Sequence, residues 1–194
     1  MDFLYRFVLQ TLKPSIMKKI FLLLILCSLT VFSQDKEFKF SKDGITDFIV
    51  VEVPGKSTNE LYNQTLLWIN KFYKNPEKVV LAKVEGDYIR FEGFSNSLLC
   101  FNALGKTFYD STYQIEVSFQ DGKYKFDLIE VNLLGTKSDP HMSLTDMSEY
   151  YKKSGDIKGT YKYFPEIFPK FFNDINQSLF DYLRGESLKK SKDW

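Results

Sequence analysis

The sequence has few of the side chains that bind metals or form disulfides. Its 194 residues include two cysteines, Cys27 and Cys100, and one histidine, His141. A structural zinc site needs several thiolates or imidazoles, so the sequence predicts no metal site and no cofactor. His141 is accordingly expected on the surface without a role in a site. Acids and bases nearly balance at a net charge of +1, so no basic excess is available for nucleic acid.

Catalytic motifs are also lacking. The serines are not in a nucleophile elbow, and Gly105-Lys106-Thr107 lacks the upstream glycine of a phosphate-binding loop. Glu116 and Glu130 lie on neighbouring predicted strands, where they could face each other as a glycosidase-like acid pair. Acids are frequent enough for such pairs to arise by chance. We therefore predict no catalytic residue and keep a hydrolase with paired carboxylates as an alternative.

The clearest feature that the sequence does have is an apolar run within residues 17–33. Two lysines follow Met17, and the small residues Val31 and Ser33 precede Gln34. This pattern is typical of a cleaved secretory signal. The run is too short for a transmembrane helix, which needs about 20 apolar residues. We therefore expect an exported protein, periplasmic or secreted, without stable membrane insertion after cleavage.

Two features of residues 1–33, the signal peptide region, leave alternatives open. Residues 1–16 fit poorly as the start of a signal, so Met17 is the expected true start. Cys27 is a candidate lipid-attachment site, which would make the protein a lipoprotein. That processing requires a small residue before the cysteine, whereas Leu26 is bulky. Cleavage after Ser33 remains the favoured interpretation.

Removal of the signal leaves 161 residues with a net charge of −2. This length suits one domain, predicted over residues 34–185, followed by a flexible tail over 186–194. Only Cys100 then remains, so no internal disulfide can form. The thiol lies in an apolar stretch, and we expect it to be buried.

Hydrophobic periodicity predicts an α+β fold in the order strand, helix, four strands, helix. The first helix begins at Ser57, where Ser57-x-x-Glu60 is a capping box. Asp121-Gly122 is typical of a tight hairpin turn, and the alternation after it slips near Ile129, as at a bulge or in a strand buried on both faces. Residues 34–44 are expected to form a short edge strand or an arm, and 135–163 an irregular connection. Short turns favour an antiparallel sheet of about five strands with both helices on one face. The strands are predicted over residues 45–53, 79–84, 88–94, 113–119 and 124–133.

Aromatic residues crowd the start of the last helix in larger numbers than one helix face can bury. They are predicted to contribute to a groove or an interface. These residues are Tyr161, Tyr163, Phe164, Phe168 and Phe172.

The segment from Val51 to Ser57, followed by Glu60-Leu61-Tyr62 and Trp68-Ile69, resembles a known family. It is similar to an exported domain of unknown function from Bacteroidetes that has a TATA-binding-protein-like (TBP-like) fold. The resemblance covers about residues 45–134 and implies a curved antiparallel sheet with helices on one face. It implies no catalytic residues, and the fold name implies no DNA binding.

The exported signal, the aromatic excess and the lack of catalytic motifs favour a non-catalytic binding or interaction module of the cell envelope. Its expected partner is an envelope protein or a small apolar ligand. The site is expected on the concave sheet face or in a groove near residues 135–172. Nucleic acid is not an expected partner.

Overall fold

The structure is a computed structural model that describes residues 37–135 and 141–185. These residues all belong to one compact unit, residues 35–194. The predicted signal, Cys27 and the predicted tail lie outside the described residues, and their predictions stay untested.

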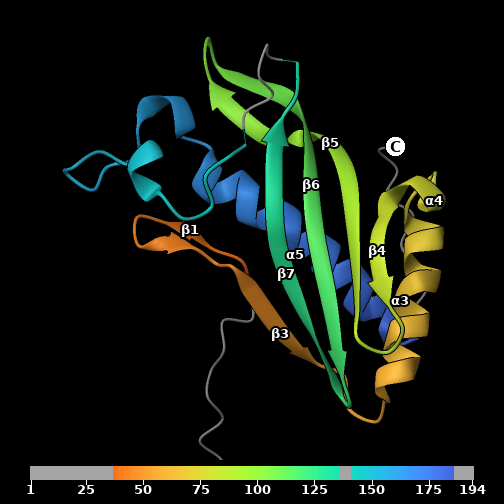
Figure 1. Ribbon diagram of the computed structural model, residues 1–194. Coiled ribbons are helices and arrows are strands. Elements are labelled where there is room, and N and C mark those ends of the chain that lie inside the picture. Colours follow the sequence, from red (N-terminus) through yellow and green to blue (C-terminus); the bar gives the residue numbers. More distant parts are fainter. Residues whose placement is uncertain (1–36, 136–140, 186–194) are drawn as a thin grey trace, which may run out of the picture. The chain divides into compact units, whose positions relative to one another are not determined.

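A five-stranded antiparallel sheet organises the domain (Figure 1). Its spatial order is β3-β7-β6-β5-β4, so β4 to β7 are neighbours in chain order and β3 adds to the outer edge of β7. The predicted α+β fold with five antiparallel strands is therefore confirmed. The strands are β3 (Phe48–Glu52), β4 (Val80–Val84), β5 (Tyr88–Asn102), β6 (Lys106–Gln120) and β7 (Lys123–Leu133).

Turn chemistry and a bulge set the register of β6 and β7. Asp121 and Gly122 connect the two strands, and Gly122 takes a positive φ of 76°, as the sequence predicts. Gln114 pairs with Glu130 but Ile115 pairs with Leu128, which leaves Ile129 as an extra residue. The predicted slip is therefore a bulge.

Strand β5 is longer than predicted and continues past residue 94 to Asn102. The register with β6 shifts between Ser95 and Leu99. The Ser95 hydroxyl accepts hydrogen bonds from the N–H groups of Ser97 (3.0 Å) and Leu98 (3.1 Å), which holds this irregular stretch together. Beyond it, Leu98, Leu99 and Cys100 are all buried, and burial raises the pKa of the Cys100 thiol.

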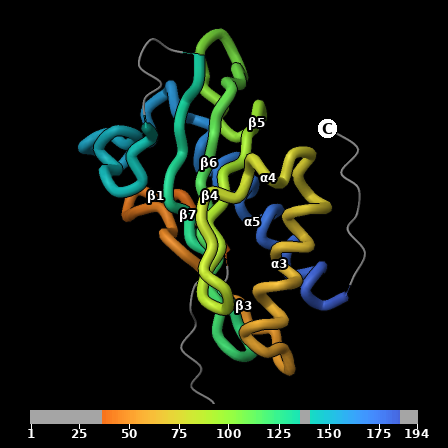
Figure 2. The backbone as a smooth tube through the Cα atoms, turned by 45° about the vertical axis from the view of Figure 1, so that its right-hand side comes forward, coloured from red at the N-terminus to blue at the C-terminus, as the bar shows by residue number. Residues whose placement is uncertain are grey.

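Helices α3 (Thr58–Phe72) and α5 (Phe164–Leu183) cover the same face of the sheet (Figures 1 and 2). The Trp68 ring of α3 packs edge-on against Phe91 of β5, and Phe171 of α5 packs edge-on against Tyr113 of β6. The Trp68 indole N–H donates to the Ser178 hydroxyl at 3.2 Å and joins the two helices. Sequence analysis missed a short helix, α4 (Pro76–Val79), between α3 and β4.

Residues near the N-terminal end of the described chain form a separate hairpin of β1 (Phe40–Ser41) and β2 (Gly44–Ile45). They do not extend the main sheet. Phe38 and Phe40 are buried, and the Phe38 ring contacts both Phe126 of β7 and Phe172 of α5. The irregular connection before α5 contains two single helical turns, η1 (Met147–Glu149) and η2 (Gly159–Tyr161).

The N-terminus of α3 is tied to the β6–β7 turn. Ser57 and Glu60 form the predicted capping box, since each side chain accepts from the other residue's backbone N–H. The Asp121 carboxylate also accepts from the N–H and the hydroxyl of Thr58, both at 2.8 Å. These hydrogen bonds lower the pKa of Asp121, and one acid thereby serves both a hairpin turn and a helix terminus.

A close approach in the core depends on Gly93. The Tyr113 ring lies directly over it, and a Cβ atom at this position would overlap the ring. The Tyr113 hydroxyl is 3.1 Å from that of Tyr73 at the C-terminus of α3. Burial raises the pKa of Tyr113 to about 12, so this hydroxyl pair stays neutral at physiological pH.

We expect Gly93→Ala to destabilise the domain by about 1–3 kcal/mol, because the added methyl group displaces a fully buried ring. Urea unfolding followed by circular dichroism measures the change. Gly159→Ala is the matched control, since a Cβ atom there meets open space and the glycine has no positive φ. The control should stay within about 0.5 kcal/mol of the wild type. An equal effect of both substitutions would contradict the steric role of Gly93.

The lowered pKa of Asp121 predicts a pH dependence of stability. The folded state favours the charged carboxylate, so its contribution is full above the ordinary Asp pKa and is lost as pH falls through the lowered value. NMR titration of the carboxyl carbon should give a midpoint below the ordinary value. Thr58→Ala should raise this midpoint, and Thr58→Ser, which keeps both donors, should not. An unchanged midpoint in Thr58→Ala would contradict the hydroxyl's contribution.

Candidate functional site

Three of the predicted groove residues are part of the core. Phe164, Phe168 and Phe172 are 1%, 2% and 0% exposed. Their burial corrects the prediction that they line a groove or an interface. Tyr161 and Tyr163 remain half-buried, and the ammonium group of Lys106 lies 4.9 Å from the centre of the Tyr163 ring.

The aromatic side chains at the start of α5 are buried because segments other than the main sheet also cover this helix. The Phe40 ring from β1 contacts both Phe164 and Phe168 edge-on. Tyr150, from the irregular connection, contacts Phe40 and Phe164 on the same side. The prediction compared the rings with what one helix face can bury, and it did not include the aromatic side chains that reach α5 from β1 and from the irregular connection.

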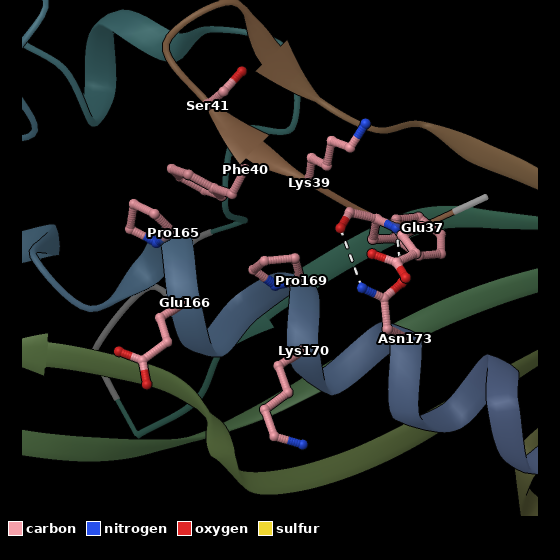
Figure 3. A pocket seen from close by; sticks show the side chains of 10 residues that line it. Glu37, Lys39, Phe40, Ser41, Pro165, Glu166, Pro169, Lys170 and Asn173 are labelled. Carbon is pink, nitrogen blue, oxygen red and sulfur yellow. Dashed lines mark hydrogen bonds between the residues drawn. The ribbon is translucent and has the colours of Figure 1, made fainter. Parts of the chain in front are cut away.

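An open groove does lie along α5, but on a different face. We call it the β1–α5 groove; its volume is about 580 Å³ (Figure 3). One wall is the backbone and side chains of residues 37–41, and the other is the first half of α5. The α5 residues that line it are Pro165, Glu166, Pro169, Lys170 and Asn173.

Asn173 closes one end of the β1–α5 groove by imitating a neighbouring strand. The N–H of Phe38 donates to Asn173 Oδ1 at 2.7 Å, and Asn173 Nδ2 donates to the Phe38 carbonyl at 3.2 Å (Figure 3). One side-chain amide therefore satisfies both main-chain groups of Phe38, as a paired strand would.

The main-chain N–H and carbonyl of Phe40, two residues further along the chain, face the same way as those of Phe38. The N–H of Thr46 donates to the Lys39 carbonyl at 3.0 Å, and the N–H of Lys39 donates to the Thr46 hydroxyl at 3.0 Å, so both main-chain groups of Lys39 face β2. Because main-chain groups alternate in direction along a strand, the N–H and carbonyl of Phe40 point away from β2, on the side where those of Phe38 bind Asn173 of α5. Among the described residues, this edge of β1 pairs with no strand, so it forms an open strand edge at the groove.

Two prolines shape the helix side of the groove. Pro169 lies inside α5, where its ring nitrogen carries no hydrogen to donate to the Pro165 carbonyl one turn earlier. The helix therefore presents an acceptor without its usual helical donor beside the open edge of β1. The groove thus has both main-chain donor and acceptor groups between apolar proline and phenylalanine surfaces, with the charges of Glu166 and Lys170 at its rim.

The carboxylates of the hydrolase alternative do not face each other. Glu116 pairs across the strands with Asp127, and Glu130 pairs with Gln114. Each has its own partner on the sheet face that the helices leave open. Arg90 binds Glu116 at 2.8 Å, and the imidazole of His141, exposed as expected, binds Glu130. Neither carboxylate lines either of the two pockets described in this article.

Within residues 37–135 and 141–185, no three His, Cys, Asp or Glu side chains come together in a way that would hold a metal ion. The helices of this part of the chain are too short or too polar to cross a membrane. The Cys100 thiol is buried rather than directed into a cleft.

Comparison with known proteins shows which family the chain is similar to. Residues 49–133 match the family model "Domain of unknown function (DUF4468) with TBP-like fold". The resemblance seen in the sequence is therefore confirmed. The matched stretch contains the main sheet and α3, whereas both walls of the β1–α5 groove lie outside it. No curated protein matches the chain.

Two solved structures share the fold. A DUF4468 family protein from Bacteroides ovatus is 15% identical and has a TM-score of 0.57, covering 81% of this chain and 95% of its own. A TBP-like protein from Parabacteroides distasonis is 17% identical and has a TM-score of 0.52, covering 72% of this chain and 92% of its own. At these identities, the likeness concerns the fold alone.

We expect Asn173→Ala to release the residues around Phe38, because two hydrogen bonds that each contribute about 1 kcal/mol are lost. Amide hydrogen exchange should become faster at Phe38, and urea unfolding should show a loss of about 1–2 kcal/mol. Asn173→Asp keeps an acceptor for the Phe38 N–H and should give an intermediate exchange rate. Gln177→Ala, at an exposed position of the same helix, is the control. Unchanged exchange at Phe38 in Asn173→Ala would contradict the clamp.

Proposed function

We propose that this domain is a non-catalytic interaction module of the cell envelope that binds an extended segment of a partner protein in the β1–α5 groove. The observation that carries the proposal is the open strand edge at Phe40. Extended peptides commonly bind by adding a strand to such an edge. Main-chain hydrogen bonds supply affinity in this mode, and side-chain pockets supply selectivity.

The groove offers both main-chain hydrogen-bonding groups and side-chain contact surface. Asn173 holds Phe38 in place, so the adjoining N–H and carbonyl of Phe40 are fixed in direction before a ligand arrives. Fixing the binding edge in advance lowers the entropy cost of association. The rings of Pro165 and Pro169 supply rigid apolar contact surface. Glu166 supplies a negative charge, and Lys170 a positive one that is also paired with Asp174 at 2.6 Å.

The other candidate functions have less support. A small apolar ligand would leave the main-chain groups at Phe40 unused and would face an open groove rather than an enclosed cavity. The hydrolase alternative needs two cooperating carboxylates, but Glu116 and Glu130 are each bound to another side chain. Nucleic acid is disfavoured by charge, because acids outnumber bases in the middle of the open sheet face. These residues are Glu92, Glu116, Asp127 and Glu130 against Arg90 and Lys125.

The envelope location rests on the secretory signal in residues 17–33, and it belongs to the proposal. If the signal is cleaved, the groove and its partner meet outside the cytoplasm. The intact mass of the protein from its native host tests this part. A mature N-terminus at Gln34 supports export, and a retained 1–33 segment would contradict it.

Site-specific photo-crosslinking in the native host tests the groove. A photoreactive residue in place of Glu166 should give a discrete cross-linked species, which mass spectrometry maps to one extended segment of a second protein. The same residue in place of Gln177, on the same helix but outside the groove, is the control and should give none. Asn173→Ala combined with the Glu166 probe should weaken the cross-link.

Each other outcome has a definite meaning. Equal cross-linking from both positions, or none from either, would contradict the groove as a binding site. A cross-link from Glu166 to a lipid or another small molecule would favour the apolar ligand over the protein segment.

A further inference from the structure

A second concave site lies at the turn of the β1–β2 hairpin, where Lys42 and Asp43 line it. Its volume is about 510 Å³, and we call it the lysine pocket. Four lysines line it, Lys42, Lys152, Lys153 and Lys158, whereas its one acidic lining residue is Asp43. A pocket with this balance has a net formal charge of +3, although the chain as a whole is nearly neutral.

Two turns that are far apart in the sequence bring these lysines together. Tyr151 and Ile157 form a bridge, and the N–H of Gly155 donates to the Lys152 carbonyl at 2.9 Å, so residues 151–157 form a small hairpin. Its turn lies against the β1–β2 turn. A Cβ atom added to Gly155 would lie 3.9 Å from Cδ of Lys42.

The lysines differ in how firmly they are held. The Lys158 ammonium group donates to the carbonyls of Ser148 and Glu149, both at 2.9 Å, and is thereby fixed beside η1. Lys42 is paired with Asp43 at 2.5 Å. Lys152 and Lys153 are exposed, and their ammonium groups have no partner among the described residues. One fixed cation and two available ones therefore surround the same cavity.

Two further acids lie near the pocket, and Asp146 offsets part of its positive charge, because hydrogen bonds from Ser148 and the charge of Lys158 together lower the pKa of Asp146. The Asp146 carboxylate accepts from the N–H of Ser148 at 2.9 Å, and the Asp156 carboxylate accepts from the Ser154 hydroxyl at 2.8 Å. Neither of these acids lines the cavity. Both accept hydrogen bonds from residues of their own turns.

The floor of the pocket is partly apolar. Met147 and Tyr151 line it, and the Tyr151 ring is stacked on Phe40 with the ring centres 6.2 Å apart. The Tyr151 ring is therefore anchored to the core on one side. A ligand that combines an anionic group with a carbon skeleton would fit this mixture of cations and apolar surface.

We propose that the lysine pocket binds a phosphate-bearing ligand. The cations that line it are all ammonium groups. Lysine is a common phosphate-binding residue that acts as a compact point charge, so several ammonium groups around one cavity suit the multiple charged oxygens of a phosphate group. The shared chemistry is a phosphate group, which a soluble phosphorylated compound or a phospholipid headgroup could supply.

Calorimetric titration of the full chain with pyrophosphate tests the site, because this probe has phosphate charge and no other chemistry. Saturable binding should weaken about tenfold in the double variant Lys152→Gln/Lys153→Gln, since removal of two of the four cations lowers the Coulomb attraction. Lys78→Gln/Lys83→Gln is the matched control, with the same charge change at exposed positions outside the pocket, and its affinity should stay within about twofold of the wild type.

A second arm distinguishes the sources of the phosphate group. Co-sedimentation with vesicles of phosphatidylcholine containing phosphatidylglycerol, against phosphatidylcholine alone, measures binding to a headgroup. Retention by the anionic vesicles that the Lys152/Lys153 variant loses and the control variant keeps assigns the pocket to a lipid surface. Pyrophosphate binding without such retention assigns it to a soluble ligand.

The proposal is overturned if the wild type binds neither pyrophosphate nor anionic vesicles. It is equally overturned if both double variants weaken binding to the same extent, because the effect would then follow net charge alone. These results are independent of the β1–α5 groove, since neither Glu166 nor Asn173 is changed.

Discussion

The packing of α5 against the inner face of the sheet is the contact on which the rest of the structure depends. Phe172 near its middle is fully buried and contacts Tyr113 of β6 and Phe38 of the N-terminal segment. The Tyr124 hydroxyl of β7 donates to Asn176 at 2.8 Å, so even the polar part of this interface is satisfied. A sheet with one apolar face is stable only when that face is covered. The last helix of the chain therefore completes a core that earlier elements begin, and it fixes both walls of the β1–α5 groove.

The two faces of the sheet differ in character, and this difference bears on where ligands can bind. The open face carries charges that pair across strands, with Arg90 bound to Glu116 at 2.8 Å, while Lys125 binds Asp127 on its own strand at 2.6 Å. Such pairs suit a solvated surface and contribute little to stability individually. The inner face is filled by helices. The two concave sites instead adjoin the β1–β2 hairpin, which packs on α5 outside the main sheet. One runs along residues 37–41, and the other lies at the turn formed by Lys42 and Asp43. Our proposals concern these sites because main-chain edges and charges remain available there.

Part of the candidate site has a signal in the sequence. Phe38 and Phe40 alternate as in a strand, and the sequence analysis expected residues 34–44 to form a short edge strand or an arm. Pro169 was not singled out, although a proline inside a helix removes an N–H group and could have marked the helix wall. The pairing of Asn173 with Phe38 had no such signal, because the two are 135 positions apart and an asparagine on a helix is ordinary. The lysine pocket was hidden for the same reason. Lys42 joins Lys152 and Lys153 only when two distant turns meet. Aromatic counting misled us about Phe164, Phe168 and Phe172, since it did not include the rings that cover α5 from β1 and from Tyr150.

Local sequence alone determined the features that act over a few residues. The capping box at Ser57, the Asp121-Gly122 turn and the slip at Ile129 follow from hydrogen-bonding groups and side-chain period, which are encoded within a short window. Tertiary structure decided the pairing of β3 with β7, the extension of β5 to Asn102 and the docking of the β1–β2 hairpin on α5. These features depend on which apolar surfaces meet in space. Many alternative pairings bury similar areas, so the choice among them belongs to the whole packed domain rather than to any one segment.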